Sequence, residues 1–176
     1  KIKHGRGIRS VRKVAEKYGG ELLLKDQGLS AKEIVGILEA SKEQIHTLGV
    51  LDTLEYLKKG GRISAATAFL GGAMAIKPVV AVSEGEIIML GKARGSKNGN
   101  NFLMKEIEKA DGIDFTHPFC LGYTGLSDEM LQKYIKDSEA LWSGHTDQLP
   151  VCSLGATIGT HVGPGAIAVA FFSPQS

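Results

Sequence analysis

The chain contains little cysteine: only Cys120 and Cys152 occur among its 176 residues. Neither belongs to a Cys-x-x-Cys pair or lies beside a histidine, so the spacing offers neither a disulfide framework nor a zinc finger. The sequence also has no His-x-x-x-His or His-Glu-x-x-His pair, the signature of zinc hydrolases. Because both cysteines lie in apolar stretches, we expect buried, reduced thiols in a cytosolic protein.

The chain also lacks a strong charge excess and a long hydrophobic run. A formal net charge of +2 is too small to argue for nucleic acid or an anionic membrane surface as a partner. The longest apolar stretches, 65–82 and 166–172, are too short or too interrupted to span a bilayer, and no signal peptide is visible. With 43% apolar residues, the chain is expected to be an ordinary soluble globular protein that buries a core without disulfides or metal.

The N-terminal part reads as helical. The chain begins at Lys1 without an initiator Met, and residues 8–18 carry apolar side chains at helical spacing. Ser30 and Glu33 fit the capping box that opens a second helix. We expect residues 1–45 to be a helical connecting segment from a missing N-terminal domain, and residues 46–176 to form an α/β domain.

Short strands alternate with helices in the rest of the chain. We expect strands at 46–51, 76–82, 87–90, 119–124, 151–154 and 166–172. We expect helices at 53–59, 65–70, 102–110 and 127–142. The glycine-rich segments 91–99 and 155–164 are expected to be connections, and Pro78 predicts an edge strand or a bulge. Because Ser83–Glu86 is a hairpin turn, the predicted fold is an α/β layered sandwich with a mixed or antiparallel sheet.

The first candidate site lies at the end of the predicted helix 53–59. Gly60 and Gly61 allow the chain to turn sharply, and Arg62 follows directly. An arginine held on a tight turn can present its planar guanidinium to a carboxylate or a phosphate. The alternative interpretation is an ordinary helix end followed by a solvated arginine.

The second candidate is the segment 155–165, which is rich in Gly and Ala. Its polar side chains are Thr157, Thr160 and His161. Because Ile158 and Val162 flank it, His161 is expected to be partly buried and able to donate a hydrogen bond to an anion. The alternative is a core histidine that is hydrogen-bonded to the backbone.

The third candidate is the polar, basic segment 92–101. A cation, a glycine and a hydroxyl just before a helix resemble a phosphate cradle, since helix-start N–H groups attract anions. The Walker A spacing is missing, and a solvated loop is the alternative. No Gly-x-Ser-x-Gly elbow is present, and Gly5-x-Gly7 lacks the preceding strand of a dinucleotide site. The carboxylates offer no evident inward-facing pair for acid–base catalysis.

Four segments together resemble the signatures of the DegV family. Three of them, 51–64, 76–78 and 92–95, resemble its central signature, and 155–166 resembles its C-terminal signature. Their order and spacing agree with the family over about residues 1–172. The resemblance implies that 46–176 is the C-terminal domain of a bacterial, two-domain fatty-acid carrier that binds a long-chain fatty acid, needs no cofactor and is not itself an enzyme.

The resemblance also implies roles for particular residues. Arg62 and His161 match positions near the bound carboxylate, with Gly61 and Thr160 beside them, and Arg94 matches an arginine associated with docking or membrane approach. The implied partners are a separate ATP-dependent fatty acid kinase subunit and, transiently, a membrane, with no nucleic acid. The family's Ser/Thr-rich carboxylate-binding loop is missing from these residues. The small residues between 65 and 75 would line an acyl tunnel or simply permit close helix packing.

Two rival functions remain open from the sequence. A phosphotransferase or hydrolase would use the Arg94–Asn101 loop for phosphate, beside a metal-binding carboxylate cluster. A plain interaction module would have a solid core and no tunnel.

Overall fold

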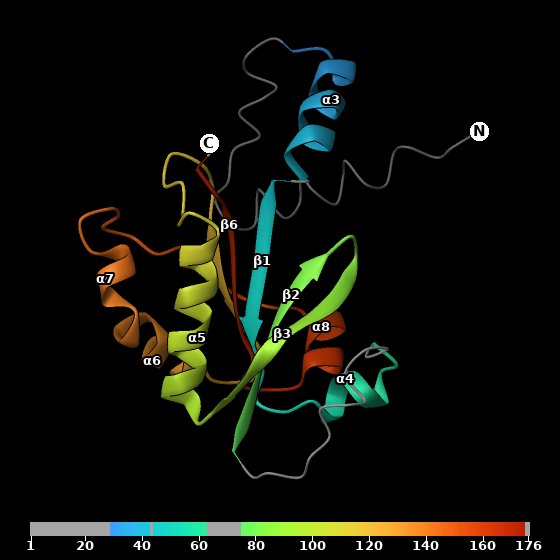
Figure 1. The fold of residues 1–176 in the computed structure, drawn as a ribbon. Coiled ribbons are helices and arrows are strands. Elements are labelled where there is room, and N and C mark those ends of the chain that lie inside the picture. The colour runs from blue at the N-terminus through green and yellow to red at the C-terminus, as the bar shows by residue number, and fades with distance from the viewer. Residues whose placement is uncertain (1–28, 43, 63–74, 175–176) are drawn as a thin grey trace. The chain divides into compact units, whose positions relative to one another are not determined.

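The computed structural model describes residues 29–42, 44–62 and 75–174 (Figure 1). The chain divides into two compact units, residues 1–43 and 44–176. In the first unit the described element is helix α3 (Ala31–Lys42). Its capping box is confirmed, because Ser30 N donates to Glu33 Oε2 at 2.7 Å and Glu33 N donates back to Ser30 Oγ at 3.4 Å. The predicted division of the chain into a connecting segment, residues 1–45, and an α/β domain, residues 46–176, stays a prediction.

The second unit is built on one mixed sheet of six strands, in the order β3-β2-β1-β6-β4-β5. The strands are β1 (Ile45–Val50), β2 (Ile76–Ser83), β3 (Glu86–Arg94), β4 (Cys120–Tyr123), β5 (Val151–Ser153) and β6 (Ile167–Phe172). Neighbouring described strands pair antiparallel, except β4 and β5, which run parallel. The predicted mixed sheet and the hairpin of β2 and β3 are therefore confirmed.

Helices cover the sheet from two sides. They are α4 (Glu55–Lys59), α5 (Ser96–Lys109), α6 (Glu129–Asp137), α7 (Glu139–Trp142) and α8 (Ala156–Val162). Figure 1 shows α5, α6 and α7 on one side of the sheet, with the short helices α4 and α8 on the other. The layered α/β sandwich expected from the sequence is thus present, with unequal layers.

The larger hydrophobic core lies under α5 and α6. Strand residues such as Val79 and Val169 are fully buried against Leu103 and Ile107 of α5, which are one helical turn apart. Each fully buried side chain of this size contributes roughly 1.5–3 kcal/mol through the hydrophobic effect. This face therefore supplies most of the stability that holds the sheet in place.

The smaller cluster lies on the opposite face, under α4 and α8. Because successive side chains of a strand point to opposite faces, Val80 contacts this cluster while its neighbour Val79 contacts the large core. Leu51, Leu57 and Ala166 are buried with Val80. Ile87, Met89, Leu54 and Val162 are only partly buried around them. This face is consequently less filled, and a pocket opens on it.

The prediction that residues 91–99 form a connection is wrong. Strand β3 continues to Arg94 and α5 begins at Ser96. Two of the three glycines here serve close packing: a Cβ on Gly91 would lie 2.8 Å from Cζ of Phe102, and one on Gly99 would lie 3.1 Å from a methyl group of β1, whereas Gly95 has φ 79° and forms the turn between β3 and α5. At Gly91 and Gly99, the missing side chain lets helix α5 pack closely on the strands. A sequence pattern does not distinguish such glycines from turn glycines.

The prediction that residues 155–164 form a connection is also wrong, because most of this segment is helix α8. Gly155 and Gly159 have ordinary backbone angles with open space around them, whereas Gly163 has φ 78° and ends the helix. Each glycine inside a helix costs about 1 kcal/mol relative to alanine. Packing of α8 on the sheet and on α4 compensates for this cost.

The predicted helix 127–142 is divided into α6 and α7 at Ser138. The hydroxyl of this buried serine donates to Tyr134 O at 2.6 Å and accepts a hydrogen bond from Trp142 Nε1 at 2.9 Å. A serine that bonds back to the preceding turn competes with the helical hydrogen bonds, which explains the break.

Pro78 lies in β2, which is an inner strand, while β3 forms the edge. The predicted irregularity is present as a register shift between Val79 and Val80. Pro78 has no N–H to donate, and its carbonyl accepts from Leu51 N at 2.9 Å. The predicted helices 8–18 and 65–70, and most of the small-residue run 65–75, lie outside the described residues.

The two cysteines lie close together on neighbouring strands. Both are free and half-buried, rather than fully buried as expected, with their Sγ atoms 3.5 Å apart. Burial, followed by the neighbouring Cys152, raises the pKa of the Cys120 thiol to about 12. Cys120 therefore stays protonated at neutral pH.

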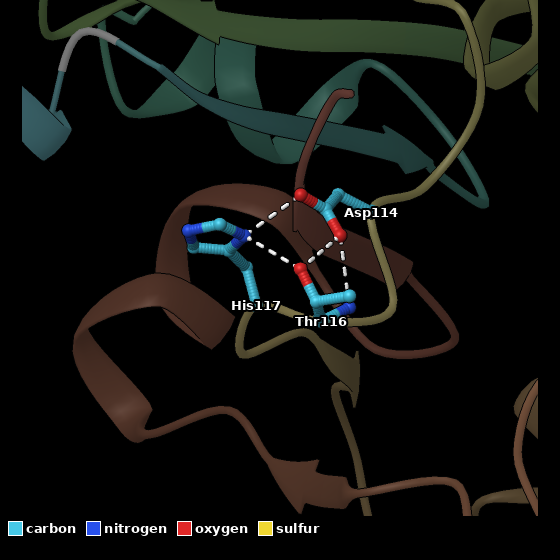
Figure 2. A network of polar contacts seen from close by, with 3 residues as sticks. All are labelled: Asp114, Thr116 and His117. Atoms are coloured by element: carbon cyan, nitrogen blue, oxygen red, sulfur yellow. Dashed lines mark hydrogen bonds and ion pairs between the residues drawn. The ribbon is translucent and has the colours of Figure 1, made fainter. Parts of the chain in front are cut away.

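A polar network closes the loop that leads into β4 (Figure 2). Asp114 accepts hydrogen bonds from Thr116 Oγ1 at 2.6 Å and Thr116 N at 2.8 Å, and its other oxygen lies 2.7 Å from His117 Nδ1. The backbone N–H of Asp114 donates to Phe172 O of β6 at 2.8 Å. These contacts, led by the Thr116 hydroxyl, hold the pKa of Asp114 below its ordinary value of 3.8.

This network predicts a pH-dependent contribution to stability. The folded-state pKa of Asp114 lies below the unfolded one, so the contribution is present above the unfolded pKa and is lost as pH falls through the folded pKa. We expect D114N to unfold at lower urea concentration than wild type at about pH 7, with the gap narrowing below about pH 4. Urea unfolding followed by circular dichroism measures this gap. The exposed Asp111, whose φ of 61° asparagine tolerates, provides the control D111N, and a D114N gap independent of pH would contradict the prediction.

Candidate functional site

A pocket of about 440 Å³ opens on the face of the sheet that carries α4 and α8. Three separate segments line it: the end of α4, the hairpin of β2 and β3, and α8. The lining residues are Gly61, Arg62, Val82, Gly85, Glu86, Ile87, Ile158, His161 and Val162. The first two sequence candidates, residues 60–62 and 155–165, therefore meet in space.

Arg62 is placed by the way α4 ends. Gly61 has φ 64°, a left-handed conformation that favours glycine, and its N–H donates to Lys58 O at 3.1 Å. Arg62 N then donates to Leu57 O at 3.0 Å, which fixes the backbone directly after the turn. The exposed side chain of Arg62 donates one long hydrogen bond, from Nη1 to Gly60 O at 3.4 Å. A guanidinium has further N–H donors that can bind an anion in the pocket.

His161 enters the pocket from the last turn of α8. Its Nδ1 is buried and has no hydrogen-bond partner within the described ranges of the chain. Ile158, one turn earlier, is 49% exposed, and Val162 is half-buried. The pocket thus combines an imidazole with apolar side chains, as the sequence pattern suggested.

Helices α4 and α8 approach each other closely through Gly163 and Tyr56. A Cβ on Gly163 would lie 2.3 Å from Cδ2 of Tyr56, so no other residue fits without moving the ring. The φ of 78° at Gly163 is a second reason for glycine at this position. This contact brings the end of α8 against α4, which carries the turn to Arg62.

Thr124 anchors the chain after α8. Its hydroxyl donates to Gly163 O at 2.6 Å and accepts from Ala166 N at 3.0 Å, and its side chain is buried. Its carbonyl also accepts from Gly165 N at 3.0 Å. The turn that ends α8 is therefore attached to the end of β4. Sequence reasoning missed Thr124, because a single threonine after a strand carries no sign of a partner so far along the chain.

The other predicted site residues lie elsewhere. The hydroxyl of Thr160 donates to Ala156 O at 2.7 Å, and Thr160 is not among the described residues that line the pocket. Arg94 is at the far end of β3 from the pocket, opposite Ile76, whereas Ile87 at the near end is opposite Val82. At about 3.3 Å per residue, the strand from Ile87 to Arg94 spans about 23 Å. The ligand-binding roles of Thr160 and Arg94 stay predictions.

Sequence reasoning also missed the hairpin side of the pocket. Val82 and Ile87 are cross-strand partners near its tip, and Val82 is 46% exposed. Strand alternation directs Ile87 to the same face as Val80 and Met89, and its neighbour Glu86 to the other face. The period of the strand could have identified Ile87, but only the pocket shows that it lines the same cavity as Arg62 and His161.

The Lys77 of the family-like segment 76–78 has a structural role. It forms an ion pair with Asp52, the second residue after the end of β1. A Cβ on Gly165 would lie 3.7 Å from that of Asp52, so the turn after α8 packs beside this pair. The ion pair therefore supports the segments that surround the pocket.

Two polar side chains of the segment proposed as a phosphate cradle are engaged in hydrogen bonds within the protein. Asn98 donates to Arg94 O at 2.8 Å, and the buried Asn100 donates to Asp137 Oδ2 at 2.8 Å. In the part of the chain that the structure describes, no group of three or more His, Cys, Asp or Glu side chains is arranged to hold a metal ion. None of the described helices is both long and apolar enough to cross a membrane.

The anchoring by Thr124 predicts a measurable loss of stability on substitution. T124V keeps the side-chain shape but leaves the buried Gly163 carbonyl and Ala166 N–H without this hydroxyl. We expect the free energy of unfolding to fall by about 1–3 kcal/mol, measured by urea denaturation. The exposed Thr157 on α8 provides the matched control T157V, which should change it by less than about 0.5 kcal/mol. Equal effects of both substitutions would argue against the anchor.

Comparison with known proteins places the chain in a family. The family model described as "Uncharacterised protein, DegV family" matches residues 22–174. A DegV domain-containing protein of Caldanaerobacter subterraneus is 30% identical over 147 residues, which cover 82% of this chain and 51% of that protein. The chain spans about half the length of the curated relatives that it matches.

Solved structures agree with this assignment. The DegV family protein of Thermus thermophilus whose structure reports fatty acid binding is 30% identical, with a TM-score of 0.70 over 86% of this chain and 53% of its own. The fatty acid kinase B3 protein of Streptococcus pneumoniae, solved with linoleic acid, has a TM-score of 0.72 at 24% identity, over 86% and 52%. The second likeness shows the fold alone. This chain belongs to the DegV family.

Proposed function

We propose that this chain binds a long-chain fatty acid, with the carboxylate held by Arg62 and His161. The observation that carries the proposal is that these two side chains, distant in sequence, line one pocket together with exposed apolar residues. The similarity to the Thermus thermophilus protein, whose structure reports fatty acid binding, supports this ligand class.

Arg62 and His161 give the pocket hydrogen-bond donors that suit a carboxylate head group, while strand alternation directs the side chain of Glu86, the acidic residue of the lining, to the other face of the strand. A carboxylate that leaves water must be paired or well hydrogen-bonded, otherwise its transfer costs several kcal/mol. Arg62 offers a permanent positive charge with a planar arrangement of donors, and the imidazole of His161 offers one more N–H. Both groups lie at the end of a helix, where the turns at Gly61 and Gly163 fix the course of the backbone beside them.

The apolar side of the pocket suits the acyl chain. Val82, Ile87, Ile158 and Val162 border the two polar groups, and Val82 and Ile158 are among the large hydrophobic side chains that stay exposed. Each methylene buried against such residues contributes about 0.8 kcal/mol. Binding of a long chain would therefore cover apolar surface that is otherwise in contact with water.

We further propose that the intact protein is a carrier without catalytic activity of its own or a resident cofactor. It would present the fatty acid to a separate ATP-dependent kinase subunit in the bacterial cytoplasm, with transient membrane contact when the ligand is exchanged. Support comes from the family signatures of the sequence. Arg94, which lies at the other end of β3 from the pocket, fits a docking role better than contact with the same carboxylate.

The N-terminal boundary is part of the same proposal. Because the chain spans about half of its curated relatives, residues 1–45 would connect to a domain that supplies the remaining carboxylate contacts. Residues 46–176 would supply Arg62, His161 and the apolar wall. Thr160 and Gly61 would act next to them, Gly61 through the turn that it allows.

Substitution of the two head-group residues tests the proposal. We expect R62A to weaken fatty-acid binding by about ten- to a hundredfold and H161A by about tenfold, as expected for lost charge-assisted and neutral hydrogen bonds. Dissociation constants from calorimetry on the intact protein measure this, together with mass spectrometry of a solvent extract. The exposed Lys59 on α4 gives the control K59A, which removes a positive charge near the pocket but outside its lining. Unchanged affinity in both R62A and H161A would overturn the assignment.

A further inference from the structure

Gly60 occupies a position where the backbone does not require glycine. Its φ of −80° and ψ of 0° lie in a region that every L-residue adopts, in contrast to the φ of 64° at Gly61. Glycine is therefore needed at positions 60 and 61 for two different reasons. Conformation explains the second glycine, and the first needs another explanation.

The explanation is the ring of His161. A Cβ on Gly60 would lie 2.5 Å from His161 Nδ1 and 3.3 Å from its Cε1. Carbon atoms in ordinary contact stay about 3.5–4.0 Å from their neighbours, so a methyl group and the ring cannot both occupy this space. Even alanine at this position would push the imidazole away from the end of α4.

Gly60 also contacts the other head-group residue. Its carbonyl oxygen accepts the hydrogen bond from Arg62 Nη1 at 3.4 Å. The same residue thus packs against the imidazole with its Cα and holds the guanidinium with its carbonyl. Displacement of the ring would change the distance between the two groups that we assign to the ligand.

The contact also selects one form of the imidazole. His161 Nδ1 faces Gly60, is buried, and has no hydrogen-bond partner among the residues that the structure describes. A proton on that nitrogen would be a buried donor without an acceptor, and buried N–H groups without a partner are rarer in proteins than buried acceptors without one. Burial of Nδ1 therefore favours the neutral form that carries its proton on Nε2, the nitrogen that can donate to a carboxylate.

We infer that Gly60 is a positioning residue for the fatty-acid head group: the absence of its side chain lets His161 pack beside Arg62 with Nε2–H directed to the ligand. This inference rests on the proposed function for its effect on binding. The tautomer of the ring can be measured without any ligand.

Nitrogen NMR of the ligand-free intact protein tests the tautomer. Protonated and unprotonated ring nitrogens have well-separated ¹⁵N shifts, so wild type should show His161 as the Nε2–H form. In G60A, the ring should leave its place, and its two nitrogens should move towards the averaged shifts of a solvated histidine. The control is G159A, since Gly159 lies on α8 with open space around its Cβ and an ordinary φ. A wild-type ring protonated on Nδ1 would overturn the inference.

Binding measurements test the positioning in a double-mutant cycle. We expect G60A to weaken binding of a long-chain fatty acid by about tenfold, comparable to H161A, because both remove the same hydrogen bond. In the H161A background, G60A should change affinity by less than about twofold, since the ring is then absent and the remaining close neighbour of the methyl group, the Tyr56 carbonyl oxygen at 3.2 Å, needs to shift only slightly. G159A should leave affinity unchanged.

The cycle separates the possible failures. If wild type binds no fatty acid, the proposed function fails, while the NMR result still decides the role of Gly60. If wild type binds and G60A weakens binding equally with and without the His161 ring, the positioning role is wrong. If G60A does not fold, G60A/H161A should fold as well as H161A; failure of both to fold would also overturn the inference.

Discussion

The close approach of α4 and α8 is the constraint on which the candidate site depends. The two helices are short, and neither would be stable in isolation. They are held because Tyr56 packs onto the backbone at Gly163, while Thr124 attaches that same turn to the end of β4. Without this contact, Arg62 and His161 would lie on separate surface segments. The pocket is therefore a consequence of backbone proximity, and glycine is the residue that permits it.

The two faces of the sheet divide stability and binding between them. One face packs against α5 and α6 through a large, fully buried core that holds the strands in register. The other carries a small cluster with several partly buried side chains, and the pocket opens beside it. A binding site needs unfilled space and apolar surface in contact with water, and both reduce stability. Placing them opposite the large core lets the sheet stay ordered while one face remains open to a ligand.

Glycine is required for two different reasons in this chain, a left-handed backbone or close packing, and sequence patterns do not distinguish them. At Gly61 and Gly163 the backbone is left-handed, so glycine marks a turn as expected. At Gly91 and Gly99 the backbone is regular, and glycine admits a neighbouring helix. The segments 91–99 and 155–164 are predicted to be connections because every glycine in them counts as a turn residue, whereas Gly91 and Gly99 admit a neighbouring helix and Gly155 and Gly159 have open space around them. The contact that distinguishes them lies in a distant part of the chain.

The sequence by itself determined the mixed α/β class, the hairpin, the capping box of α3, the family, and the choice of Arg62 and His161 as candidates. These follow from local spacing, since hydrophobic period, turn residues and family signatures are each contained in a short segment. Only the tertiary structure decided that these two residues line one pocket, that Val82 and Ile87 border it, and that Thr124 supports it. Strand pairing and helix contacts join residues far apart in the chain, and no local pattern encodes which distant partner a side chain will meet.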